Sequence, residues 1–230
     1  MPALELTFRA AAAPGWAAWV LLALIALATL GAHASRRALV GGEALPPLRA
    51  LYPQLALQLG AVGLVAALAS RELALEVWRR PAPSAGAWAW GGLALAAMLA
   101  AAALLWRVTP ADERARRAAL IPATSDERAL LVLLACVAGL AEELAWRAVL
   151  PALIARWTGS AWAGVALAAG SFGLAHALQG RLAMGVVLVL ALVFQGLVEV
   201  AGSLWVAVAV HAAYDAGVGL WLAPRLRDRG

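Results

Sequence analysis

The stretch 130–157 constrains the fold of this chain more than any other part of it. It reads LLVLLACVAGLAEELAWRAVLPALIARW, which is apolar for more than a bilayer thickness but carries Glu142, Glu143 and Arg147 near its middle. A carboxylate at the centre of a spanning helix costs at least ~2.5 kcal/mol, and it is tolerated where it faces a bundle interior or a watery cavity. We therefore expect this helix to carry a site whose partners lie elsewhere in the chain.

The composition excludes a soluble domain. Of the 230 residues, 64% are hydrophobic and 13% are charged, and the mean hydropathy is +0.84. These values are typical of a polytopic membrane protein. The sequence predicts an all-α transmembrane bundle, one domain over residues 1–230, with about seven spanning helices (six to eight). The expected spans are 16–30, 54–70, 88–106, 130–157, 161–178, 182–200 and 204–222.

The segments between the spans differ in character. Residues 71–80 are charged and could lie along the interface as an amphipathic extension. Residues 107–128 form the only long hydrophilic stretch and are expected to be a surface loop with some helix. Pro151 is expected to kink the fourth span. Cys136 is the single cysteine, so no internal disulfide can form, and its apolar surroundings favour packing.

Every basic residue is an arginine, and the 18 arginines lie in short patches between apolar runs. This pattern favours topology signals that face anionic lipid over nucleic-acid binding. With seven spans, twelve arginines fall on one side and five on the other, which predicts a cytoplasmic C-terminus and an external N-terminus. The Ala/Arg-rich, lysine-free composition favours a bacterial plasma membrane.

The first span raises the alternative of a cleaved signal peptide. Ala32-His33-Ala34 is similar to a signal-peptidase site, but Arg36 and Arg37 follow it at once. A signal peptide keeps its positive charge on the N-terminal side, so the pattern favours an uncleaved span. His33 is expected to be a solvated loop residue.

Within the fourth span, Glu143 and Arg147 share a helix face at a spacing of i, i+4. Such a pair neutralises two buried charges, and a structural role is favoured over a catalytic one. Glu142 is rotated away and has no local counter-charge. An unpaired intramembrane carboxylate suits a general base or a proton carrier.

Two of the three histidines fall in later spans. His176 ends the fifth span, one turn after Phe172, and His211 in the seventh span has Asp215 at i+4. Either histidine alone could simply bond between helices. A carboxylate at Asp215 could hold one ring nitrogen of His211 while the other nitrogen binds metal or a substrate oxygen. Convergence of Glu142, His176 and His211 on one cavity would satisfy all these groups.

Other sequence patterns indicate less about function. Gln195 and Glu199 share a face of the sixth span, where a structural role is favoured. There is no HExxH zinc motif, no GxSxG nucleophile elbow and no glycine-rich phosphate loop. A hydrolase built on this chain would have to activate water.

The motifs Glu142-Glu143-x-x-x-Arg147, Phe172-x-x-x-His176 and His211-x-x-x-Asp215, in this order, resemble those of the CPBP intramembrane proteases. That family contains the CAAX prenyl endopeptidases and the bacterial Abi proteins, which are linked to bacteriocin processing and immunity. The resemblance covers residues 129–222 and implies a catalytic core there. The third motif ends in Asn or Asp in the family, and this chain has Asp215 and no asparagine at all.

The resemblance implies an intramembrane endopeptidase that cuts a peptide or protein substrate at the membrane. Glu142 with His176 would polarise a water, His211 would stabilise the oxyanion, and Asp215 would orient His211. The family is labelled metalloprotease, so Glu142, His176 and His211 are also candidate ligands of a divalent metal such as zinc. Two other functions stay open: a non-catalytic scaffold in immunity or signalling, and a small proton-coupled transporter. Neither the substrate nor the oligomeric state follows from the sequence.

Overall fold

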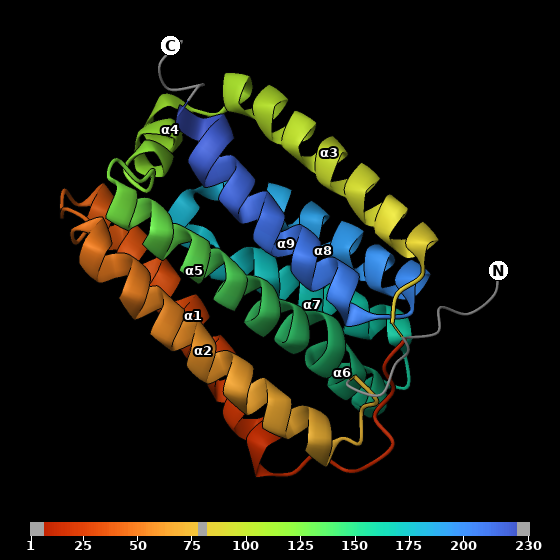
Figure 1. Cartoon of the computed structure of the whole chain (residues 1–230). Coiled ribbons are helices and arrows are strands. Elements are labelled where there is room, and N and C mark those ends of the chain that lie inside the picture. The colour runs from red at the N-terminus through yellow and green to blue at the C-terminus, as the bar shows by residue number, and fades with distance from the viewer. Residues whose placement is uncertain (1–6, 78–81, 225–230) are drawn as a thin grey trace.

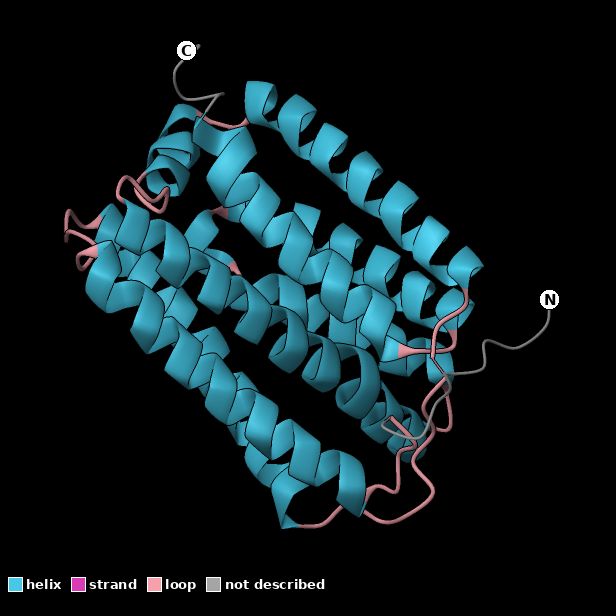
Figure 2. Ribbon diagram, viewed as in Figure 1, coloured by secondary structure: helices cyan, strands magenta, loops and turns pink. Residues whose placement is uncertain are grey.

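The computed structural model describes residues 7–77 and 82–224, and within these ranges the regular structure is entirely helical (Figures 1 and 2). The predicted all-α class is confirmed. Nine α-helices are present in the described residues: α1 Trp16–Val40, α2 Leu48–Glu72, α3 Ala85–Val108, α4 Ala111–Ala118, α5 Ser125–Glu143, α6 Leu150–Thr158, α7 Ala161–Ala175, α8 Arg181–Ala201 and α9 Leu204–Gly217. Two π-helical turns, η1 Leu144–Val149 and η3 Val218–Leu222, and a 3₁₀ turn, η2 Ala177–Gln179, complete the order.

The helices form a bundle with α5 at its centre. α5 packs against α2 on one side and against α9 on the other, while α6, α7 and α8 pack in sequence behind them. Figure 1 shows α1 and α2 at one edge of the bundle and α3 at the opposite edge, where it contacts α8 and α9. The central helix is thus the one whose apolar run contains the charges.

Six helical segments among the described residues are long and apolar enough to cross a membrane, and α7 is a shorter apolar helix of 15 residues. The chain is a multi-pass membrane protein. The predicted fifth span ends earlier than expected because the chain leaves the α-helix at His176, continues as η2 and turns at Gly180, whose φ is +116°. An apolar sequence does not reveal where such a helix stops.

The fourth span is one continuous segment, Ser125–Thr158, with η1 in its middle. Thr124 and Glu127 form a capping box that fixes its start. The expected irregularity is present, but it begins at Leu144, directly after the two glutamates, and not at Pro151 itself. Pro151 has no N–H to donate to the preceding turn, and π turns of this kind are frequent at functional sites.

Three expectations about segment ends were wrong. α1 continues to Val40, so Ala32-His33-Ala34, Arg36 and Arg37 lie inside a helix and His33 is not a loop residue. α2 begins at Leu48 and therefore includes Pro53, which lies in its second turn and has no N–H to donate to the helix. The charged extension after the second span does not form over residues 73–77, because the chain turns at Leu73 and Ala74. The rest of that extension, residues 78–80, lies outside the described residues.

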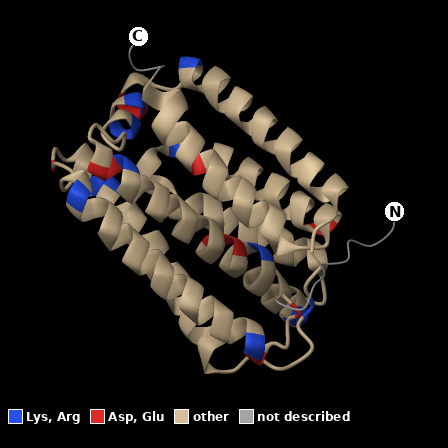
Figure 3. Ribbon diagram, viewed as in Figure 1, with Lys and Arg blue, Asp and Glu red and all other residues tan. Residues whose placement is uncertain are grey.

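The arginines gather at one end of the bundle (Figure 3). This end holds the C-termini of α1 and α3, α4, and the N-termini of α2, α5 and α8, with Arg36, Arg37, Arg49, Arg107, Arg114, Arg116, Arg117, Arg128 and Arg181. Arg79, Arg80 and the tail arginines Arg225, Arg227 and Arg229 lie outside the described residues. A cytoplasmic position for the arginine-rich end stays a prediction of the positive-inside rule.

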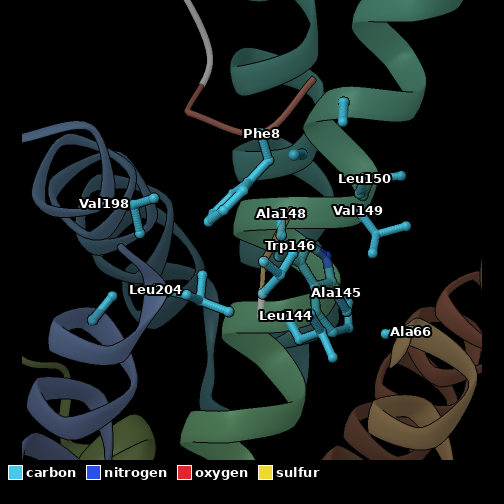
Figure 4. Close-up of a cluster of buried hydrophobic side chains, with 14 of the residues drawn as sticks. Phe8, Ala66, Leu144, Ala145, Trp146, Ala148, Val149, Leu150, Val198 and Leu204 are labelled. Carbon is cyan, nitrogen blue, oxygen red and sulfur yellow. The ribbon is translucent and has the colours of Figure 1, made fainter. Parts of the chain in front are cut away.

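Small residues let α9 approach α5 closely. A Cβ added to Gly139 would lie 2.9 Å from the Val208 carbonyl oxygen and 3.1 Å from the Ala212 nitrogen. Because Ala212 follows His211, this close approach brings the imidazole to the α5 carboxylates. Around η1, a buried apolar cluster that includes Phe8, Leu144, Trp146 and Val149 holds the π turn in place (Figure 4).

Candidate active site

The central charges lie at the junction of α5 and η1. Glu142 and Glu143 end α5, and Arg147 lies inside η1. All three residues are buried, and the Glu143 and Arg147 side chains are 0% and 1% exposed. Figure 3 shows this charged group in the middle of the bundle, far from the arginine-rich end.

Glu143 links two helices. Its Oε1 lies 3.3 Å from Arg147 Nη2, so the predicted ion pair is present. The same oxygen accepts a hydrogen bond from His211 Nδ1 at 2.8 Å. A carboxylate can only accept, so Nδ1 carries the proton in this bond. Glu143 therefore fixes the orientation of a histidine that lies 68 positions further along the chain.

The other ring nitrogen of His211 faces two more carboxylates. His211 Nε2 lies 3.5 Å from Glu142 Oε2 and 3.6 Å from Asp215 Oδ2. The Asp215 side chain is 38% exposed, which makes it the most accessible member of the group. We expected Asp215 to hold one ring nitrogen of His211 and leave the other nitrogen free to act on the substrate. The structure has a different arrangement. Glu143 holds Nδ1, and Asp215 lies beside Nε2 together with Glu142.

His176 approaches the group from α7 through an aromatic ring. Its Nδ1 donates to the Phe172 carbonyl oxygen at 2.8 Å, which leaves Nε2 unprotonated in a neutral ring. The Phe172 ring lies 4.6 Å from the His176 ring and 6.3 Å from the His211 ring, centroid to centroid. Among the described residues, no nitrogen of His176 is within 4.0 Å of a Glu142 oxygen. The site thus brings five predicted residues into direct contact, and His176 joins them through Phe172.

Two aromatic residues complete the site, and one of them, Phe194, has no distinguishing signal in the sequence. Phe194 of α8 stacks on the His211 ring at 5.0 Å, and its ring lies 5.7 Å from the Arg147 guanidinium carbon. Phe172 covers the same guanidinium at 4.4 Å. Phe194 lies in an apolar span, where an aromatic residue resembles ordinary core.

A second link between α7 and the fourth span was also missed. Trp146 Nε1 donates to Ser171 Oγ at 3.0 Å, and its ring meets Phe172 edge-on at 5.4 Å. Ser171 donates in turn to the Ala168 carbonyl. This bond fastens η1 to the turn of α7 that precedes Phe172, and it shows Ser171 as a structural hydroxyl.

The candidate metal ligands do not form a coordination sphere. Among the described residues, no group of three or more His, Cys, Asp or Glu side chains is arranged to hold a metal ion. Both nitrogens of His211 already face carboxylates, and His176 is directed to its own helix through Nδ1.

Comparison with known proteins gives a family match over the part of the chain that contains these residues. Residues 124–217 match a family model described as type II CAAX prenyl endopeptidase Rce1-like. The match begins at the capping box of α5 and ends at the last residue of α9, so it contains all three motifs. No curated protein and no solved structure matches the chain.

Proposed function

Residues 124–217 match the model of the Rce1-like family of type II CAAX prenyl endopeptidases, and on that premise we propose that Glu142 activates water for peptide hydrolysis. The observation that carries the proposal is the 3.5 Å approach of Glu142 Oε2 to His211 Nε2. It joins an acid and an imidazole from two helices inside the bundle. Glu143 and Arg147 support that pair from behind.

In the proposed reaction, Glu142 takes a proton from a water whose oxygen attacks the scissile carbonyl carbon. The unprotonated Nε2 of His176 accepts a hydrogen bond from the same water, which helps to orient it. A direct contact between Glu142 and His176 would exclude that water, so their separation by more than 4.0 Å is compatible with this role. Glu142 then delivers the proton to the leaving amine nitrogen, and the products are a carboxylate and an amine.

His211 is assigned to the carbonyl oxygen. When both ring nitrogens are protonated, Nδ1 donates to Glu143 and Nε2 can donate to the carbonyl oxygen of the substrate. A donor placed there stabilises the negative charge that develops on the oxygen in the transition state. Ionised Asp215 accepts hydrogen bonds only, so we assign it to hold the Nε2–H of His211 until the substrate oxygen replaces it as acceptor.

The substrate is proposed to be a peptide or protein segment that reaches the membrane-embedded site. Because the family description names a prenyl endopeptidase, the assay tests whether cleavage requires a prenyl group on the substrate. A matched pair of peptides, with and without an isoprenoid on cysteine, distinguishes the two. A scaffold without turnover is the competing function, and the same assay separates it.

The test uses purified protein in proteoliposomes and a quenched fluorescent peptide. Loss of a general base typically lowers rates by about 100-fold or more, so Glu142→Gln and His176→Ala should each lose at least that much cleavage. Glu199→Gln is the matched control, because Glu199 is a half-buried carboxylate near the end of α8 whose hydrogen bonds are to Thr7 and Gln195. Wild-type rates in Glu142→Gln would contradict the assignment, and an inactive wild-type protein would favour the scaffold.

A further inference from the structure

The connection between α7 and α8 is held from outside by the short helix α4. η2 and Gly180 form this connection, and His176 immediately precedes it. The α8 N-terminus has no side-chain cap of its own, because its N-cap residue is Gly180. A helix N-terminus leaves four backbone N–H groups without intrahelical partners, so these donors need acceptors from elsewhere.

Glu113 of α4 supplies the acceptor. Its Oε1 accepts hydrogen bonds from the backbone nitrogens of Arg181 at 2.8 Å and Leu182 at 3.3 Å. The Glu113 side chain is 8% exposed, and Arg117 one turn later lies 3.8 Å from Oε2. A buried carboxylate from a different helix thus caps α8 across 68 positions of sequence.

The capped end of α8 is connected to His176 through two backbone hydrogen bonds of the intervening turn. Gly180 N donates to the Ala177 carbonyl and Gln179 N donates to the His176 carbonyl, each at 3.1 Å. Gly180 has a φ of +116°, a conformation that L-residues rarely adopt, and the Glu113 carboxylate packs directly against it. The backbone from His176 to Arg181 is therefore fixed at one end by α7 and at the other by Glu113.

We propose that Glu113 is a positioning residue for His176. It acts through the backbone and touches no reacting atom. By pinning the α8 N-terminus, it sets where η2 ends, and so it sets the direction in which the His176 ring enters the bundle. The inference rests on the proposed function, because it assumes that the position of His176 matters for cleavage.

The test compares three substitutions in α4. Glu113→Ala removes the acceptor, Glu113→Gln keeps a side-chain oxygen that can accept, and Asp112→Ala removes an exposed carboxylate whose hydrogen bond is to Arg116 on the same helix. A small displacement of a catalytic group can lower the rate by up to about 100-fold. We expect Glu113→Ala to lower kcat about tenfold with KM within about twofold. Glu113→Gln and Asp112→Ala should stay near wild-type kcat.

A structural readout tests the same idea without turnover. The chain has three histidines, so acylation by diethyl pyrocarbonate can be followed at each by mass spectrometry. Glu113→Ala should raise the acylation rate of His176 several-fold and leave those of His33 and His211 unchanged. A general loosening of the fold would raise the rate at His211 as well, which would overturn the positioning role.

The outcomes separate the two proposals. If His176→Ala abolishes cleavage but Glu113→Ala has wild-type kcat and wild-type His176 acylation, the positioning role is wrong and the proposed function stands. If His176→Ala cleaves normally, the proposed function is wrong. The acylation pattern then decides whether Glu113 positions the histidine.

Discussion

Two carboxylate clusters, a buried one on α5 and a half-buried one on α8, have partners of opposite kinds. Glu199 accepts from Thr7 N at 2.7 Å, from Thr7 Oγ1 at 2.6 Å and from Gln195 Nε2 at 2.6 Å. All three donors are neutral groups, and the cluster fastens the N-terminal segment to α8. Glu142 and Glu143 instead meet Arg147 and His211, which are ionisable.

The difference distinguishes a carboxylate that holds structure from one that can do chemistry. A charge satisfied by neutral donors has no group with which to exchange a proton. A carboxylate beside an imidazole has a partner with which it can exchange a proton. Ionisable residues inside a membrane usually mark functional sites. The mere presence of an acid in a span is therefore less informative than the chemistry of its neighbours.

The largest effect is expected from removing the rear support of His211. Glu143→Leu leaves Arg147 buried without its counter-charge, which should lower the free energy of unfolding by about 3–5 kcal/mol. The double variant Glu143→Leu/Arg147→Met removes both charges and should recover most of that stability. Cleavage by the double variant should still fall by at least about 100-fold, because His211 has lost the acceptor that orients it.

Thermal unfolding in detergent and the peptide assay measure the two quantities separately. If the double variant were both stable and active, the Glu143–Arg147 pair would be structural only. The central cluster would then resemble the Glu199 cluster more than we propose.

A smaller effect is expected at Asp215. Its side chain is 38% exposed and lies 3.6 Å from His211 Nε2, so water screens it more than it screens Glu143. Asp215→Ala should reduce kcat about tenfold, whereas Asp215→Asn should stay within about threefold of wild type, since an amide can hold the same nitrogen. Steady-state kinetics of the two variants test this, and a larger loss in Asp215→Asn would assign the ionised carboxylate a direct role.

At Glu199 we expect stability to change while activity does not. Glu199→Gln and Thr7→Ala should each lower the free energy of unfolding by about 1 kcal/mol, because each weakens half-buried hydrogen bonds. Their kcat values should equal that of the wild type. A loss of cleavage in the folded Glu199→Gln protein would remove the distinction between the clusters.

Metal removal should have the smallest effect. The central side chains as placed do not form a ligand set, so dialysis against EDTA should leave cleavage within about twofold. Elemental analysis of the purified protein accompanies the assay. A stoichiometric metal whose loss abolishes cleavage would require the Glu142, His176 and His211 side chains to rearrange around it.

Much of the fold could be predicted because apolar runs and arginine patches report directly on burial in lipid. The Glu143–Arg147 pair was also predictable, since both groups lie one turn apart on the same helix. The contact between Glu143 and His211 was not, because it depends on the rotation of α9 about its axis against Gly139. Periodicity places residues on a face but does not say which face meets which.

The remaining misses share that cause. Phe194 became part of the site only through the stacking of α8 on His211, and Glu113 caps a helix to which it is not adjacent in sequence. The short length of α7 was hidden because Ala177 and Leu178, the first residues of η2, are as apolar as the helix before them. Each depends on contacts between distant segments.

The 15 residues of α7 have a consequence for the reaction itself. At 1.5 Å per residue the helix is about 22 Å long, less than the roughly 30 Å of hydrocarbon in a bilayer. After His176 the chain turns through η2 instead of continuing the α-helix, and it lies beside α4 at the arginine-rich end of the bundle. Hydrolysis consumes one water molecule per turnover, and the hydrocarbon core of a bilayer does not supply water. The early end of α7 places His176 toward the arginine-rich end of the bundle, the side from which we expect that reactant to enter.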